Sequence, residues 1–578
     1  MLKFKDYIIK IRNKYSEFDS IITIFCVMIF AILVFVIFRQ PVTEQKSQST
    51  GFYQNKAEQY YYQGEYDKSI EEYQSMQQEQ DWPIYKAKIA TVYTAKKEYK
   101  TSDNMLDESV SKRNEIVNDS NIDEYRDRDI ELGNIVTLTY LLNGENDKAE
   151  SAGEYFQSQD GDSKTLDKTM VMVYLANGKS DKAKQIADNY NIDTESASDT
   201  SSLARVYFTL SNYDKAIELM KDAWNLDKNE LRVFDIITDA TNDNNNTFIN
   251  KLMDLSSKNP KEISYKIFLL KYYQVKKDKI NNTDLLLPSI NDSDDNNYIL
   301  HSIKRDIFAN RGDATGAKNE DNSILDIEDD SSAVYNLKAS TYINMKDYIK
   351  ANEQCIQSIL ADPDYAGNYT NIMPLILSKE KSSSMAEGYY LAALYKDPSD
   401  YNVIKKIGDY YNNSINDSDT AYRYYELASK VKSDDAEIFY SMAQLKISEK
   451  DYTSAITLLD KCSKINNKEI KYPRAMGTVY YLAGKNEQSI AKIREAYQIN
   501  SNDVKNLNNA GCYYFTAEKD ILRGMVNLKY AYNLMDENTD IDTKQIITEN
   551  YQKAKQIYST YIKDTNAKLT IPDMQMIN

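Results

Sequence analysis

Few side chains in this sequence could carry catalysis, and those few lack the neighbours that catalysis needs. The 578 residues include one histidine, His301, which excludes most His-based metal and acid–base sites, and four cysteines, too few for a disulfide-stapled framework. Residues 109–112 (Ser-Val-Ser-Lys) have the spacing of a serine nucleophile with a lysine base, but in a Ser/Lys-rich stretch that spacing arises by chance. Residues 291–295 are acidic but lack the glycine and the distal glutamate of a calcium loop. We therefore predict no enzymatic activity and no catalytic, cofactor-binding or metal site.

The chemistry that remains is non-covalent binding. The chain has 49 tyrosines, and aromatic rings offer flat contact area to peptide side chains or to sugar rings. Asparagine side chains, which are also frequent, can both donate to and accept from an extended peptide backbone. The formal charge of −17 disfavours nucleic acid and other anionic polymers as partners.

The elements that position these side chains are predicted to be helices in an internal repeat. With only 16 Gly and 9 Pro, the composition favours long helices joined by short turns. A small residue recurs every 33 to 35 residues, apart from one gap of 47 residues and one of 101 that spans three periods. These small residues are Ser69, Ser102, Ala149, Ala183, Ala216, Ala317, Ala351, Ala386, Ala421, Ala455, Ser489 and Gly524. Twelve visible units and two hidden in the long gap predict fourteen.

This pattern resembles the tetratricopeptide repeat (TPR) family, a helix–turn–helix unit of 34 residues. An aromatic residue closes the first helix of most units, and a small residue stands three positions before it, as in Ala57 with Tyr60 and Ala204 with Tyr207. The resemblance implies an all-α superhelical solenoid of about fourteen repeats, because one unit cannot bury its own apolar face. It covers about residues 50–538.

The predicted domain organisation follows the repeats. We expect the N-terminal part of the TPR array at 50–230, degenerate repeats at 231–297, the C-terminal part at 298–538, a capping helix at 539–563 and a tail at 564–578. His301, Cys355 and Cys462 fall on slots where the family has core side chains, so we expect them to be buried. Cys512 is the one cysteine expected to be accessible.

A membrane segment is predicted ahead of the array. Residues 21–38 form an uninterrupted apolar run without a charge, long enough to cross a bilayer. Five basic residues precede the run, so the positive-inside rule places residues 1–20, a basic and amphipathic segment, in the cytoplasm. We expect a single-pass signal anchor of a bacterial plasma membrane, a linker at 39–49 and an extracytoplasmic array. A cleaved signal peptide is the alternative.

The resemblance also implies where partners bind, since the first helices of TPR proteins line a concave face. The partner-binding candidates on this face are Tyr61, Asn336, Asn371, Tyr440, Arg474, Tyr481, Asn508 and Phe515. A carboxylate clamp of the kind that captures chaperone tails needs Lys and then Asn four residues later. Lys168 is followed there by Met172 and Lys405 by Asp409, which disfavours a chaperone-docking receptor.

The leading functional hypothesis is a membrane-anchored scaffold that binds protein partners in a cell-envelope assembly, such as that of a surface polymer or polysaccharide. Two alternatives stay open. One is a groove-mediated glycan-binding module, favoured by the many tyrosines. The other is a structural protein that self-assembles into homo-oligomers by stacking its solenoids.

Overall fold

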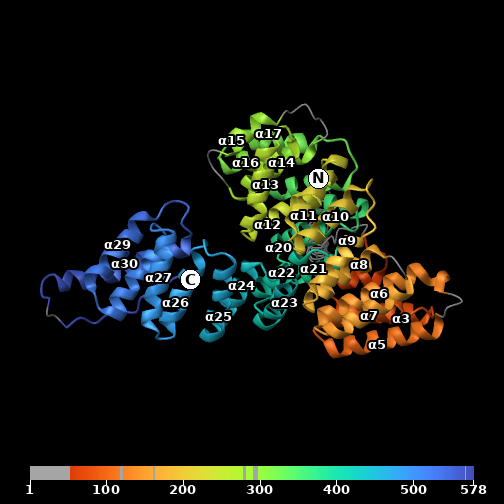
Figure 1. Cartoon of the computed structure of the whole chain (residues 1–578), viewed down its shortest axis with the longest axis horizontal. Coiled ribbons are helices and arrows are strands. Elements are labelled where there is room, and N and C mark those ends of the chain that lie inside the picture. Colours follow the sequence, from red (N-terminus) through yellow and green to blue (C-terminus); the bar gives the residue numbers. More distant parts are fainter. Residues whose placement is uncertain (1–51, 118–121, 161–162, 278–281, 291–296, 566–567) are drawn as a thin grey trace, which may run out of the picture. The chain divides into compact units, whose positions relative to one another are not determined.

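A computed structural model describes residues 52–117, 122–160, 163–277, 282–290, 297–565 and 568–578 (Figure 1). All of them except Phe52 belong to one unit, Tyr53–Asn578. The predicted membrane anchor at 21–38, with its flanking segments 1–20 and 39–49, lies outside the described residues. Within the described ranges, no helix combines the length and the apolar character that crossing a bilayer requires.

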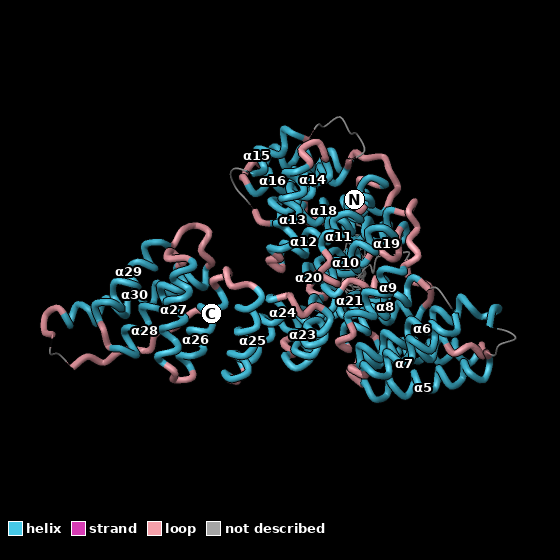
Figure 2. Tube along the Cα trace, viewed as in Figure 1, coloured by secondary structure: helices cyan, strands magenta, loops and turns pink. Residues whose placement is uncertain are grey.

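Fourteen helix pairs follow one another in the described ranges, in agreement with the predicted TPR-type solenoid (Figure 2). The first helices of the pairs are α2 (Lys56–Tyr62), α4 (Ile84–Ala95), α6 (Ile122–Asn143), α8 (Lys164–Ala176), α10 (Ala197–Thr209), α12 (Leu231–Asn242), α14 (Ile263–Val275), α16 (Tyr298–Asn310), α18 (Ser332–Asn344), η2 with α20 (Asn368–Ile372 and Met373–Lys379), α22 with η4 (Tyr401–Tyr410 and Tyr411–Ile415), α24 (Ala436–Ser448), α26 (Lys471–Leu482) and α28 with η5 (Val504–Tyr513 and Tyr514–Glu518).

The second helices pack antiparallel to the first ones, pair by pair. They are α3 (Tyr66–Gln78), α5 (Tyr99–Ile116), α7 (Asn146–Asp160), α9 (Ser180–Asn189), α11 (Tyr213–Leu226), α13 (Asn246–Lys258), α15 with η1 (Asn282–Leu286 and Leu287–Ser289), α17 (Ala314–Leu325), α19 (Tyr348–Ala361), η3 with α21 (Ser383–Met385 and Ala386–Lys396), α23 (Ser418–Val431), α25 (Tyr452–Ile465), α27 (Asn486–Ile499) and α29 (Ile521–Leu534). A last helix, α30 (Ile541–Tyr561), packs on α29 and α28.

A left-handed residue ends the first helix of every pair in the described ranges. Five of these residues are glycines, such as Gly64 with φ of 70°, and nine carry a side chain, such as Lys450 with φ of 62°. The next backbone N–H bonds back to the helix, as Asp451 N–H does to the Lys446 carbonyl at 2.9 Å. This arrangement satisfies carbonyl groups that a helix end leaves without partners, and it turns the chain sharply into the second helix.

Small residues let the two helices of a pair approach closely, as the repeat pattern predicts. Ala57 and Ala204 are fully buried. At Gly511 a side chain has no room, because a Cβ atom there would lie 2.5 Å from Leu528 of the second helix. These contacts confirm the reading of the small slot as a close-packing position.

Later repeats fill the groove of the earlier ones. Helix α21 contacts α2, α4 and α6, the first helices of three successive pairs, and α23 contacts α8. The Tyr395 hydroxyl lies 2.9 Å from Thr139 Oγ1, and the Tyr66 hydroxyl donates to Glu387 at 2.7 Å. The face that these first helices share is therefore covered by the chain itself, which the sequence did not predict.

Candidate functional site

An extended segment of the chain lies in a groove at the other end of the array. Residues 568–578, here called the tail segment, have no regular secondary structure and lie against α26, α28 and α30. The Asn509 side chain binds both backbone groups of Ile577: Nδ2 donates to the carbonyl at 2.6 Å, and Oδ1 accepts from the N–H at 2.7 Å. Thr478 on α26 donates to the same carbonyl at 3.4 Å.

A second asparagine repeats this contact two residues earlier along the tail segment. Asn550 on α30 donates through Nδ2 to the Gln575 carbonyl at 2.7 Å and accepts the Gln575 N–H at Oδ1 at 3.1 Å. Asn508 donates to the same carbonyl at 3.0 Å, and its Oδ1 accepts from Asn550 at 2.9 Å. We call Thr478, Asn508, Asn509 and Asn550 the amide clamp.

In the amide clamp, asparagine side chains bind the backbone of the tail segment in the way that a neighbouring strand would bind an added β-strand. In an extended chain the backbone groups of residues i and i+2 point to the same side. Residues 575 and 577 therefore both present N–H and C=O to the clamp, and uncharged amides satisfy all four groups. Such contacts recognise an extended backbone irrespective of its side chains, as in β-strand addition.

Apolar pockets receive the side chains of the tail segment. Met574 is 8% exposed and belongs to the core around Phe515, while Ile577 is 8% exposed and packs with Ile547. Leu569, Ile571 and Met576 are partly buried against the same clusters. The amide clamp holds the backbone, and these pockets supply selectivity for side chains.

Cys512 lies beneath the tail segment, so the prediction that it is accessible is wrong. Its side chain is fully buried, and its thiol donates to the Gln575 carbonyl at 3.6 Å. Burial raises the pKa of the Cys512 thiol to about 12. Cys355 and Cys462 are buried, as predicted.

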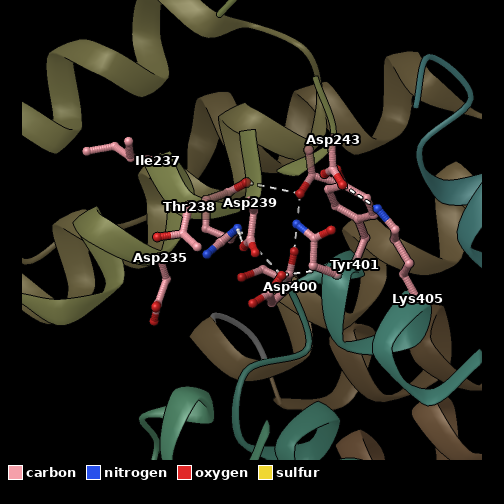
Figure 3. A network of polar contacts seen from close by, with 12 residues as sticks. Asp235, Ile237, Thr238, Asp239, Asp243, Asp400, Tyr401 and Lys405 are labelled. Atoms are coloured by element: carbon pink, nitrogen blue, oxygen red, sulfur yellow. Dashed lines mark hydrogen bonds and ion pairs between the residues drawn. The ribbon is translucent and has the colours of Figure 1, made fainter. Parts of the chain in front are cut away.

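A group of buried charged side chains joins the earlier repeats to a later part of the array (Figure 3). Arg205 on α10 is 3% exposed and donates to Asp239 on α12 at 2.6 Å. Its guanidinium also lies 3.6 Å from Asp400, the residue that caps α22. A buried arginine thus joins carboxylates from two distant parts of the array.

The same contact continues through Asp243, the residue that follows α12. Asp243 accepts from the Tyr401 hydroxyl at 2.9 Å and forms an ion pair with Lys405 (Figure 3). Lys405 Nζ lies 3.7 Å from Asp435 as well. We call Arg205, Asp239, Asp243, Asp400 and Lys405 the closure junction.

Burial governs protonation in the closure junction. It raises the pKa of Asp243 to about 7, with the nearby Asp435 carboxylate adding to the effect and Lys405 opposing it. Burial likewise raises the pKa of Asp400 to about 7, against the opposing charge of Arg205. Desolvation therefore outweighs the attraction of the nearby cations at both carboxyl groups. Asp235, Asp397 and Lys406 face the same groups.

The structure places the predicted partner-binding residues in four kinds of surroundings. Asn508 and Arg474 are buried in the last repeats, where Asn508 contacts the tail segment and Arg474 pairs with Asp503 at 3.1 Å. Tyr481 and Tyr440 are half-buried: the Tyr481 hydroxyl donates to Thr516 at 2.7 Å, and the Tyr440 ring lies tilted against the Tyr472 ring, with 5.7 Å between the ring centroids.

The other four candidates divide between the surface and the interior. Asn371 is exposed and accepts from Lys406 at 2.9 Å, whereas Asn336 is buried and donates to Asn368 at 2.8 Å. Tyr61 is buried beneath α21, with its carbonyl close to Gly388, and Phe515 is fully buried. The role of all eight residues toward a partner stays a prediction.

One prediction about the sole histidine is wrong. The His301 side chain is 37% exposed, and its Nδ1 lies 2.6 Å from Glu320. It therefore forms a surface pair on α16 with a carboxylate of α17 and does not fill the core.

The sequence did not single out Asn509 and Asn550, although Asn509 directly follows the candidate Asn508. Three asparagines in the run 506–509 of a first helix were a signal for this site. Asn550 lies on α30, outside the repeat pattern, so no repeat slot identified it.

Similar solved structures share little sequence identity with this chain. The complex of Naa15 and Naa10 bound to HypK-THB matches with a TM-score of 0.38 at 11% identity, over 89% of this chain and 96% of that one. Yeast Tom70 matches with a TM-score of 0.34 at 15% identity, over 89% and 98%. The C-terminal part of a TPR repeat-containing protein from Cytophaga hutchinsonii matches with a TM-score of 0.32 at 18% identity, over 42% and 97%. No protein-family model and no curated protein matches the sequence.

At these TM-scores the fold assignment rests on the chain's own helix pairs. The 34-residue spacing, the left-handed turn residue of each pair and the small-residue slots agree with one another. The described part of the chain is thus an all-helical repeat solenoid whose helix pairs have the spacing of tetratricopeptide repeats. Proteins of this class use extended concave surfaces for binding.

Proposed function

We propose that this chain is a membrane-tethered, extracytoplasmic scaffold that binds protein partners as extended segments within a cell-envelope assembly. The observation that carries the proposal is the amide clamp, which holds N–H and C=O groups of alternate residues in an extended chain. Side chains arranged in this way suit a peptide, whose backbone offers these groups at regular intervals.

The tether is inferred from the sequence. Residues 21–38 are apolar throughout, and the basic residues lie on their N-terminal side. The positive-inside rule then directs the repeats away from the cytoplasm. A protease added to intact cells is expected to digest the array, and full protection of the array would contradict this orientation.

Partner binding can be tested on the full-length chain in its own membranes. A photo-crosslinking amino acid at Tyr481, beside the amide clamp, is expected to give discrete adducts with another protein. The same group at Tyr530, which is 46% exposed on the second helix α29, serves as the control and is expected to give none. Equal adducts at both positions, or none at Tyr481, would contradict a partner site on this face.

A further inference from the structure

The tail segment is held mainly through its backbone. Asn509 and Asn550 each bind both the N–H and the C=O of one tail residue, at distances between 2.6 and 3.1 Å. Because every peptide except one with proline at those positions offers the same groups, the clamp can accept other segments in extended conformation.

Two apolar pockets restrict which segments fit well. The pocket of Met574 is formed by Cys512, Phe515, Ile521, Met525, Leu528 and Ala554. The pocket of Ile577 is formed by Leu507, Ala531 and Ile547. Burial of two such side chains favours ligands with apolar residues three positions apart.

The tail segment can leave without exposing an unpaired buried charge. In the described part of the chain, the groups that bind the backbone of residues 575 and 577 are neutral amides, a hydroxyl and a thiol. Water can replace each of these hydrogen bonds, so release costs less than separating buried ions. The residues before the tail segment, 562–565, are exposed.

From these observations we propose that the groove between α26, α28 and α30 is an exchangeable peptide-binding site. Its ligand is an extended protein segment with apolar residues three positions apart, and the tail segment of this chain occupies the site until such a segment displaces it. This inference deepens the proposed function and rests on it, since displacement requires a protein partner.

The site can be tested with a fluorescent peptide of residues 569–578 and the full chain in detergent, truncated after Pro572. The truncated chain is expected to bind the peptide at least tenfold more tightly than the intact chain, whose own tail segment competes. A peptide carrying Met574→Ser and Ile577→Ser is expected to bind at least tenfold more weakly. No binding to a folded truncated chain, or equal binding of both peptides, would overturn the proposal.

Variants of the amide clamp separate this site from non-specific apolar binding. In the truncated chain, Asn509→Ala and Asn550→Ala are each expected to weaken peptide binding about tenfold. The matched control is Asn527→Ala on α29, because among the described residues the Asn527 side chain bonds within its own helix, to the Arg523 carbonyl at 2.9 Å. Loss of binding in the control to the same degree as in the clamp variants would overturn the proposal.

If truncation prevents folding, a cleavable chain keeps the test decisive. A protease recognition sequence inserted after the exposed Asp564 allows the tail to be cut after the protein has folded. Excess unlabelled peptide is expected to release the cut tail. Without added peptide, the cut chain is expected to be alkylated at Cys512 at least fivefold faster than the uncut chain, because a cut tail can dissociate. If the cut tail stays bound through a day of competition, the tail segment is a permanent part of the fold and the proposal is overturned. If the peptide exchanges but the crosslinking experiment in membranes gives no partner, the result counts against the proposed function and leaves the exchangeable site standing.

Discussion

The closure junction joins parts of the chain that are remote in sequence, and the amide clamp joins the last repeats to residues outside the regular repeat. The two contacts use opposite chemistry. The closure junction buries arginine, lysine and several carboxylates, whereas the clamp binds a peptide backbone with neutral side chains. Buried ions depend on one another, because removing one leaves the other desolvated and unpaired. Neutral amides exchange their partners for water at little cost. The junction therefore suits a permanent contact and the clamp a reversible one.

The largest effect is expected from breaking the junction at its arginine. Arg205→Met should lower the stability of the contact between α12 and α22 by about 3–5 kcal/mol, because Asp239 and Asp400 lose their buried cation. Hydrogen exchange of the amides in both helices measures this loss. Lys215→Met is the control, since the Lys215 side chain is 42% exposed and, within the described residues, its ion pair is with Glu218 one turn away. It should change stability by less than about 0.5 kcal/mol. Equal effects of the two variants would show that the junction contributes little.

The second expected difference is in pH dependence. The pKa values of Asp243 and Asp400 are raised to about 7 in the folded chain, above the ordinary value of 3.8. Stability from such groups is present at low pH and is lost as pH rises through 7. Raising the pH from 5 to 8 should weaken the junction by roughly 1–3 kcal/mol.

Hydrogen exchange, corrected for the intrinsic effect of pH, should show this change at α12 and α22 and leave the amides of Gln575 and Ile577 unaffected. Asp243→Asn should reduce the pH dependence of the junction, because the amide does not ionise in this range. The same pH response at the tail segment would contradict the distinction between the two contacts.

The third effect concerns the clamp in the intact chain. Asn509→Ala removes two hydrogen bonds to Ile577 and should weaken docking of the tail segment by about 1–2 kcal/mol. Alkylation of Cys512 should then be faster by a factor of about 5 to 30, while protection of α12 and α22 stays unchanged. Asn527→Ala should leave the alkylation rate as it is, and a faster rate there would show general loosening of the last repeats.

The smallest effect is expected from a turn residue that belongs to neither contact. Lys450→Gly should stabilise its repeat by about 0.5–1 kcal/mol, because glycine adopts the left-handed conformation of this position without a Cβ penalty. Thermal unfolding measures the gain. Hydrogen exchange at the closure junction and alkylation of Cys512 at the amide clamp should stay unchanged. A loss of stability would contradict the conclusion that this turn position favours glycine.

The repeat pattern predicted most of the fold, because each unit encodes its packing locally. The hidden repeats at α12 to α15 escaped detection in part because Ala240 stands where other units have an aromatic residue. The closure junction could not be read from the sequence, since Asp243 and Lys405 are 162 residues apart and no periodicity links them. At the clamp, Asn508 was identified by its slot, whereas Asn550 lies on a helix outside the repeat.

The contact between early and late repeats also delays the completion of folding during synthesis. An open solenoid can begin to fold repeat by repeat as it emerges, because each unit contacts only its neighbours. Here the ion pair of Asp243 cannot form until Lys405 has been synthesised. At about 5–20 residues per second, the 162 residues between them take roughly 8 to 32 s. During this interval the first helices of the early repeats have apolar surface that their later partners do not yet cover. The nascent chain therefore passes through a stage in which chaperones can bind the very face that the finished protein hides.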